Sequence, residues 1–137
     1  MKKHITSLLF ALMAFVPQMF AQDANQDAPS VQVKDIDGAP INFNTTVEKG
    51  KITVVSFWAT WCGPCKTMAP ILEEVATEAG DNARIIKIDV DKNPNVAAQY
   101  QIRGVPTLIL FKNGKILWQQ SGVVPGHQLK QILQQHA

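Results

Sequence analysis

An almost unbroken apolar run, KITVVSFWA at residues 51–59, is the feature that most constrains the fold of this chain. A strand with one solvated face alternates apolar and polar residues, whereas a strand covered on both faces is apolar throughout. The run therefore predicts a central strand in a sheet that carries helices on both faces. This arrangement places the chain in the α/β class.

Strand-like and helix-like segments alternate around this run. Apolar residues at helical spacing from Met68 to Ala79 predict an amphipathic helix, which Gly80 ends. Asn113-Gly114 indicates a type I′ hairpin, so an antiparallel pair should stand beside the parallel crossover units of a mixed central sheet. The expected order is βαβαβαββα, and its other elements are an edge strand (31–37), short helices (41–50 and 94–100), strands (84–90, 107–111 and 115–120) and a terminal helix from about residue 126.

The N-terminal residues 1–21 have the features of an export signal. Lys2 and Lys3 precede the apolar stretch LLFALMAFV at residues 8–16, and a candidate cleavage site follows Ala21. The stretch is short for a membrane span, which needs about 20 apolar residues; an uncleaved anchor remains the alternative. Residues 22–29, QDANQDAP, predict a flexible linker, and residues 30–137 form the expected domain.

The charge of the mature chain gives no reason to expect nucleic acid or anionic lipid as a partner. The chain has 13 basic and 11 acidic residues, and two of the basic ones, Lys2 and Lys3, belong to the signal. Without them the opposite charges balance, so no long-range attraction to a polyanion is expected.

The chain has two cysteines, Cys62 and Cys65, and three interpretations of the pair are possible. As a structural staple it would close a very short loop, which restricts the unfolded chain little. As a zinc site it would need further ligands, and His127 and His136, near the C-terminus, do not pair convincingly with the cysteines. A redox couple fits the placement best, because a strand leads into the pair and a helix leads out of it.

The expected helix begins near Cys62, where unpaired backbone N–H groups and the positive end of the helix dipole stabilise a thiolate. Cys65 follows one turn later on the same face, and Gly63 and Pro64 occupy the first turn. We expect an exposed Cys62 that attacks a substrate disulfide and a buried Cys65 that resolves the mixed disulfide.

The sequence resembles the thioredoxin family over essentially all of residues 30–137. The resemblance lies in several motifs that follow one another at matching separations, namely FWATWCGPCK, MAPILEE, VDKNPNVA, IRGVPTLILFKNG and LKQIL. It implies the thioredoxin fold, a thiol–disulfide oxidoreductase activity, and no cofactor or metal beyond a redox-active Cys62–Cys65 disulfide.

The resemblance also implies roles for residues outside the cysteine pair. Pro106 matches the family's cis-proline facing the disulfide, although the sequence alone also allows a simple strand-opening proline. Trp61, Val105 and Gly122 match the residues that form an apolar groove for substrate.

The implied role is that of a reductase of protein disulfides outside the cytosol, with the periplasm as the expected compartment. Gly63-Pro64 is similar to the dipeptide of disulfide reductases, and only 40 residues separate Cys65 from Pro106. We expect a monomer whose electrons come from a membrane thiol donor. The alternatives are a specialised reductase of the cytochrome-maturation type, and a redox-silent module that uses the groove without chemistry.

Ser56 is the main departure from the family, which usually has a buried aspartate at this position. Lys87 matches the lysine that pairs with that aspartate. A serine hydroxyl cannot act as a carboxylate base. Ser56 is therefore either a small buried residue bonded to backbone, or the mark of altered proton transfer at Cys65 through water or Lys87.

Overall fold

The computed structural model describes residues 28–48 and 50–137. The predicted export signal and residues 22–27 of the predicted linker lie outside this part of the chain. Ala28, at the end of the predicted linker, is buried among apolar side chains of the domain. It therefore contributes to the core rather than to a linker.

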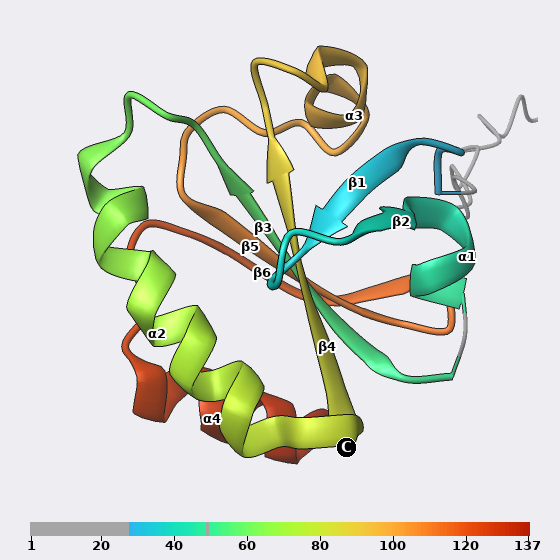
Figure 1. Cartoon of the computed structure of the whole chain (residues 1–137). Coiled ribbons are helices and arrows are strands. Elements are labelled where there is room, and N and C mark those ends of the chain that lie inside the picture. Colours follow the sequence, from blue (N-terminus) through green and yellow to red (C-terminus); the bar gives the residue numbers. More distant parts are fainter. Residues whose placement is uncertain (1–27, 49) are drawn as a thin grey trace, which may run out of the picture.

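A mixed sheet forms the centre of the fold, with strand order β2-β1-β4-β3-β5-β6 (Figure 1). β3 and β4 are parallel, and the other neighbouring strands are antiparallel. The apolar run at residues 51–59 forms β3, which pairs with β4 on one side and β5 on the other, and only the last residue of this strand is not fully buried. The strands are β1 (Gln32–Asp35), β2 (Pro40–Asn42), β3 (Ile52–Trp58), β4 (Ala83–Asp89), β5 (Thr107–Lys112) and β6 (Lys115–Ser121).

Helices cover both faces of the sheet, which confirms the predicted α/β architecture (Figure 1). On one face α2 (Gly63–Ala79) and α4 (Gly126–His136) pack over side chains such as Val54 and Leu110. On the other face α1 (Phe43–Glu48) and α3 (Pro94–Gln99) pack over side chains such as Val55 and Phe111. A short 3-10 turn, η1 (Gly80–Asn82), links α2 to β4. None of the helices in the described part of the chain is long and apolar enough to cross a membrane.

The first predicted strand is internal, so its assignment to the sheet edge was wrong. β1 lies between β4 and a short strand, β2, that the sequence pattern did not reveal. Asp35 builds the intervening turn, because its Oδ1 accepts hydrogen bonds from the backbone N–H groups of Asp37 and Ala39. Pro40 then opens the edge strand, which is a position where a missing N–H is tolerated.

The predicted hairpin between β5 and β6 is present. Asn113 and Gly114 have φ angles of 52° and 75°, and a type I′ turn requires positive φ at both central residues. The turn brings β6 back along β5, and β6 is the second edge of the sheet.

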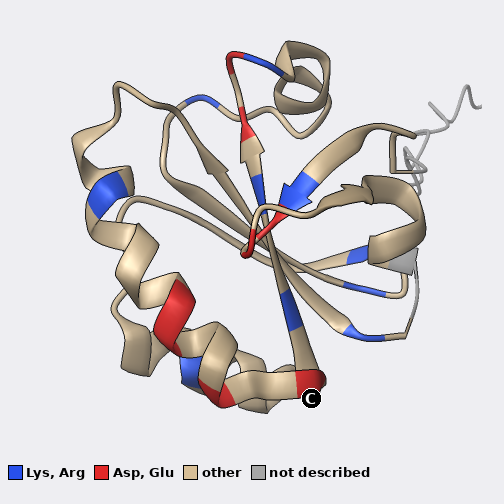
Figure 2. Cartoon of the chain, in the orientation of Figure 1, with Lys and Arg blue, Asp and Glu red and all other residues tan. Residues whose placement is uncertain are grey.

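Charged residues of both signs are dispersed over the described elements (Figure 2). The acidic residues of α2 lie in its C-terminal half, where the Lys130 ammonium of α4 donates to Glu74 and Glu78 at 2.8 Å each. These hydrogen bonds raise the pKa of Lys130. Both carboxylates are exposed, so the link guides the packing of α4 on α2 more than it stabilises the fold.

The strand pairing brings three chain segments together at one end of the sheet. The parallel strands β3 and β4 end side by side at Trp58 and Asp89, and the N–H of Val90 donates to the carbonyl of Trp58 at 3.0 Å. β5 runs in the opposite direction and starts at this same end, with Thr107 opposite Phe57. The cysteines at the start of α2 lie at this end, together with the loops that contain Asp91 and Pro106.

Candidate redox site

The two cysteines form a disulfide at the N-terminus of α2. Their Cα atoms are 5.3 Å apart. Cys62 is the N-cap of the helix, and its Sγ accepts a hydrogen bond from the backbone N–H of Cys65 at 3.1 Å. The placement predicted from the sequence, a cysteine at the helix start and a second one turn later, is therefore present.

The residues between the cysteines explain why the helix starts here. Gly63 and Pro64 form the first turn of α2, where a proline loses no hydrogen bond and its fixed φ suits the helix. The backbone N–H of Cys65, in the same turn, is directed at the sulfur of Cys62. A negative charge on this sulfur is stabilised by this N–H group and by the helix dipole.

Both cysteines are buried, so the predicted exposure of Cys62 was wrong. Cys62 is 3% exposed and Cys65 is 8% exposed. The two residues form a small apolar cluster with Ala59, against which Val90 and Val105 pack. The helix start exposes Gly63 and Pro64, but the loops that follow β4 and precede β5 cover the sulfur-bearing side chains.

The loop before β5 borders the disulfide. Val105 packs against the cysteine cluster, and the Val105–Pro106 peptide bond is cis, as the resemblance implied. The backbone N–H of Gly122 donates to the carbonyl of Pro106 at 2.8 Å. Gly122, more than fifty residues beyond the cysteines in sequence, thus lies beside the loop that touches them.

Trp61 projects from the site and is held by a residue that the sequence analysis did not single out. The indole is 69% exposed, and its Nε1 donates to Asp91 Oδ2 at 2.8 Å. The buried Asp89 shapes the loop that carries Asp91, because its Oδ1 accepts from the N–H groups of Asp91 and Lys92. The only signal for Asp91 in the sequence was its place in the motif VDKNPNVA.

Ser56 and Lys87 are neighbours across β3 and β4 and lie beneath Cys65. Together with Cys65 they line a cavity of about 140 Å³. Ser56 is 2% exposed, and among the described residues its hydroxyl has no hydrogen-bond partner. The Lys87 ammonium lies 5.3 Å from the centre of the Trp58 ring. Ser56 therefore borders the cavity beside Cys65, and the described residues show no backbone hydrogen bond of its hydroxyl.

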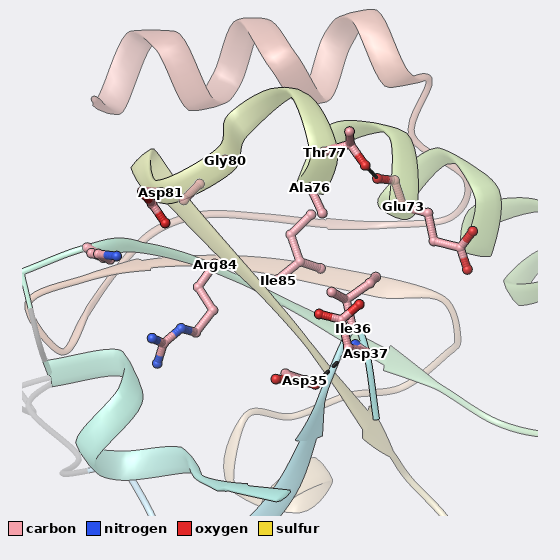
Figure 3. A pocket seen from close by; sticks show the side chains of 12 residues that line it. Asp35, Ile36, Asp37, Glu73, Ala76, Thr77, Gly80, Asp81, Arg84 and Ile85 are labelled. Carbon is pink, nitrogen blue, oxygen red and sulfur yellow. Dashed lines mark hydrogen bonds between the residues drawn. The ribbon is translucent and has the colours of Figure 1, made fainter. Parts of the chain in front are cut away.

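A larger hollow of about 540 Å³ lies towards the other end of α2, where that helix meets β1 and the start of β4 (Figure 3). It is lined by carboxylates of Asp35, Asp37, Glu73 and Asp81, which Figure 3 shows spread around the rim rather than directed at one point. Among the described residues, no group of three or more His, Cys, Asp or Glu could hold a metal ion. The cysteine pair is therefore the centre with evident chemistry in this part of the chain.

Comparison with known proteins shows which sequences are similar to this chain. The family model described as Thioredoxin matches residues 20–135. Proteins named Thioredoxin from Staphylococcus aureus strains Mu50, MW2 and N315 are each 45% identical to the chain over 106 residues. Each alignment covers 77% of this chain and 96% of the relative, so the similarity extends over the whole length of these proteins apart from their ends.

The hydrogen bond from Trp61 to Asp91 should slow hydrogen exchange at the indole. In Asp91→Ala we expect the Trp61 Nε1–H to exchange about two- to twelvefold faster, because a hydrogen bond of ~0.5–1.5 kcal/mol is lost. Asp91→Asn keeps an acceptor and should stay close to wild type. The rate is measured by NMR, with the Trp118 indole as internal reference, and equal rates in wild type and Asp91→Ala would show that the contact does not hold the ring.

Proposed function

The chain belongs to the thioredoxin family and is a thiol–disulfide oxidoreductase, and we propose that it reduces protein disulfides outside the cytosol. Members of this family act on protein disulfides through the redox-active disulfide itself and need no further cofactor. The observation that carries the proposal is Cys62 as the N-cap of α2, with its sulfur accepting the N–H of Cys65. This geometry favours a thiolate at Cys62 in the reduced protein.

The proposed reaction is a two-step exchange. The Cys62 thiolate attacks one sulfur of the substrate disulfide, which forms a mixed disulfide and releases the other substrate sulfur as a thiolate. Cys65 then loses its proton and attacks Cys62 Sγ, which restores the Cys62–Cys65 disulfide and releases the second substrate sulfur as a thiolate. The substrate gains two electrons and the protein loses two.

The proposed substrate groove consists of Trp61, Val105 and Gly122. Trp61 is an exposed aromatic residue, Val105 contacts the cysteine cluster, and Gly122 is hydrogen-bonded to Pro106. These three residues come from the loops at the same end of the sheet. An extended substrate chain beside Val105 would therefore lie close to the sulfurs.

The reductive direction is supported by Gly63-Pro64 and by the chain between Cys65 and Pro106. This stretch consists of α2, η1, β4 and α3 joined by short connections, so it carries no inserted domain of the kind found in exported oxidases. Reductases of the cytochrome-maturation type typically carry a glutamate three residues after the second cysteine, where this chain has Met68. A general reductase fits these features better than the specialised alternative.

Export is proposed from the sequence of residues 1–21, with the periplasm as the compartment. A reductase placed there needs a source of electrons, and we propose that a membrane protein with a thiol pair supplies them. We also propose that the exported protein acts as a monomer.

If the signal is removed near Ala21, the protein purified from its native cells should lack about 21 residues, and it should be found in the periplasmic fraction. Intact mass and fractionation test this, and a full-length protein in the cytosolic fraction would contradict export.

The reduction potential tests the direction of the reaction. We expect about −250 mV or below at equilibrium with glutathione, as in thioredoxin-type reductases. A value above about −180 mV would indicate an oxidase or isomerase instead. Cys62→Ser serves as the control, because a variant without the disulfide should show no redox transition.

The serine at position 56 should also alter proton transfer during the second step. Cys65 must lose its proton beside the cavity that Ser56 and Lys87 line. A carboxylate at position 56 would disfavour a nearby thiolate, whereas serine carries no charge, so we propose that the Cys65 thiol ionises more readily here than it would beside an aspartate. Lys87, or water between these groups, is the route proposed for the proton.

The substitution Ser56→Asp tests this proposal in a Cys62→Ser background, where Cys65 is the only thiol. We expect the new carboxylate to raise the pKa of Cys65 by about one or more. Ser56→Asn, which is similar in size and uncharged, should have little effect. Thiolate absorbance followed against pH gives the pKa, and identical titration of Cys65 with serine and with aspartate at position 56 would show that this position does not control the proton.

A further inference from the structure

Met68 lies on the apolar face of α2, where a methionine can pack without any hydrogen bond, but its sulfur accepts one. It lies three residues after Cys65 and is 1% exposed, and its Sδ accepts the backbone N–H of Val124 at 3.2 Å. Val124 is fully buried, and within the described residues its N–H has no other acceptor. Buried N–H groups are almost always paired, and a thioether is a weak acceptor that seldom serves this purpose. The sulfur therefore has a role beyond filling space.

The hydrogen bond fixes one end of a short loop between β6 and α4. At the other end, the N–H of Gly122 donates to the carbonyl of Pro106 at 2.8 Å. Val123 lies between the two fixed residues and is one of the few large apolar side chains that remain exposed, at 40%. The loop thus holds an apolar side chain in solvent while the residues on both sides are anchored.

These contacts form a closed path between the helix that carries the cysteines and the proposed groove. α2 leads from Cys65 to Met68, whose sulfur holds Val124. Gly122 in turn holds Pro106, and Val105 packs against the cysteine cluster. Movement of the loop would therefore require the N–H of Val124 to lose its partner in the interior, which is unfavourable.

We infer that Met68 is a positioning residue for the recognition of protein disulfides, because its thioether holds the Gly122–Val124 loop in the form that the substrate chain meets. This inference rests on the proposed function, since it concerns the groove used by that reaction. A surface that is already ordered loses less entropy when a substrate binds. Met68 should therefore matter for substrates that extend along the groove and little for small disulfides that meet only the sulfurs.

The test compares two disulfide substrates in Met68→Leu, which keeps the approximate volume and removes the acceptor. We expect the KM for insulin, a protein disulfide, to rise roughly tenfold with kcat unchanged, which corresponds to one unpaired buried N–H. The rate with 5,5′-dithiobis(2-nitrobenzoic acid), a small disulfide, should stay within about twofold of wild type, since that substrate needs no groove. Leu133→Met is the matched control, because it also exchanges leucine and methionine in the same core but lies near the C-terminal end of α4. This variant should leave the KM for insulin and the rate with the small disulfide unchanged.

Amide exchange provides a readout that does not depend on activity. In Met68→Leu the Val124 N–H should exchange roughly tenfold faster, while the Leu129 N–H, which donates to the carbonyl of Pro125 at the start of α4, should not change. Unchanged exchange at Val124, or an equal loss of rate with both disulfides, would overturn the inference.

If Met68→Leu does not fold, Met68→Gln serves as the second variant, because its amide oxygen can accept the Val124 N–H at a similar distance from the backbone. Slow exchange of Val124 together with a wild-type KM for insulin supports the inference. Fast exchange of Val124 together with a wild-type KM for insulin overturns it.

The outcomes also separate this inference from the proposed function. If the wild-type protein reduces the small disulfide but not insulin, the proposed reduction of protein disulfides fails, and recognition of such substrates through Met68 fails with it. The exchange of Val124 would still show whether Met68 holds the loop. If the wild-type protein reduces both and Met68→Leu loses neither, the proposed function stands and the role of Met68 does not.

Discussion

The pairing of β3 between β4 and β5 is the constraint on which the rest of the structure depends. Because β3 is buried on both faces, it requires α2 and α4 on one side and α1 and α3 on the other. Its parallel pairing with β4 and antiparallel pairing with β5 bring the ends of three strands to one edge. The cysteines, the loop of Asp91 and the cis-proline meet there because of strand direction, although they are far apart in sequence.

The site combines a reactive position with a protected one. The N-terminus of α2 supplies backbone N–H groups that favour a thiolate at Cys62, yet apolar neighbours exclude solvent from the disulfide. Water is a competitor for every hydrogen bond near the sulfurs, so its exclusion strengthens the effect of the helix terminus. The loops that cover the pair are themselves hydrogen-bonded: Trp61 donates to Asp91 in the loop after β4, and Gly122 donates to Pro106 in the loop before β5.

The charge beneath Cys65 depends on the side chain at position 56, while the backbone that places this side chain is part of the fold. The position of Ser56 on β3 is set by strand pairing with Lys87, and its side chain points to the α2 side of the sheet by alternation along the strand. That placement depends on the backbone, whereas the charge at the site depends on the single side chain there. Among the described residues, Lys87 therefore has no carboxylate partner and borders a small cavity.

The sequence by itself determined the elements with strong local patterns: the buried strand β3, the amphipathic helix α2, the Asn113-Gly114 hairpin and the cysteine pair at a helix start. Each of these follows from the spacing of residues close together in the chain, where backbone geometry alone decides the outcome. Only the tertiary structure decided the internal place of β1, the burial of Cys62, the bond from Trp61 to Asp91 and the bond from Val124 to Met68. The two bonds join residues 30 and 56 positions apart. Such contacts arise when separate elements pack into one interior, and no periodicity along the chain records which side chains that packing brings together.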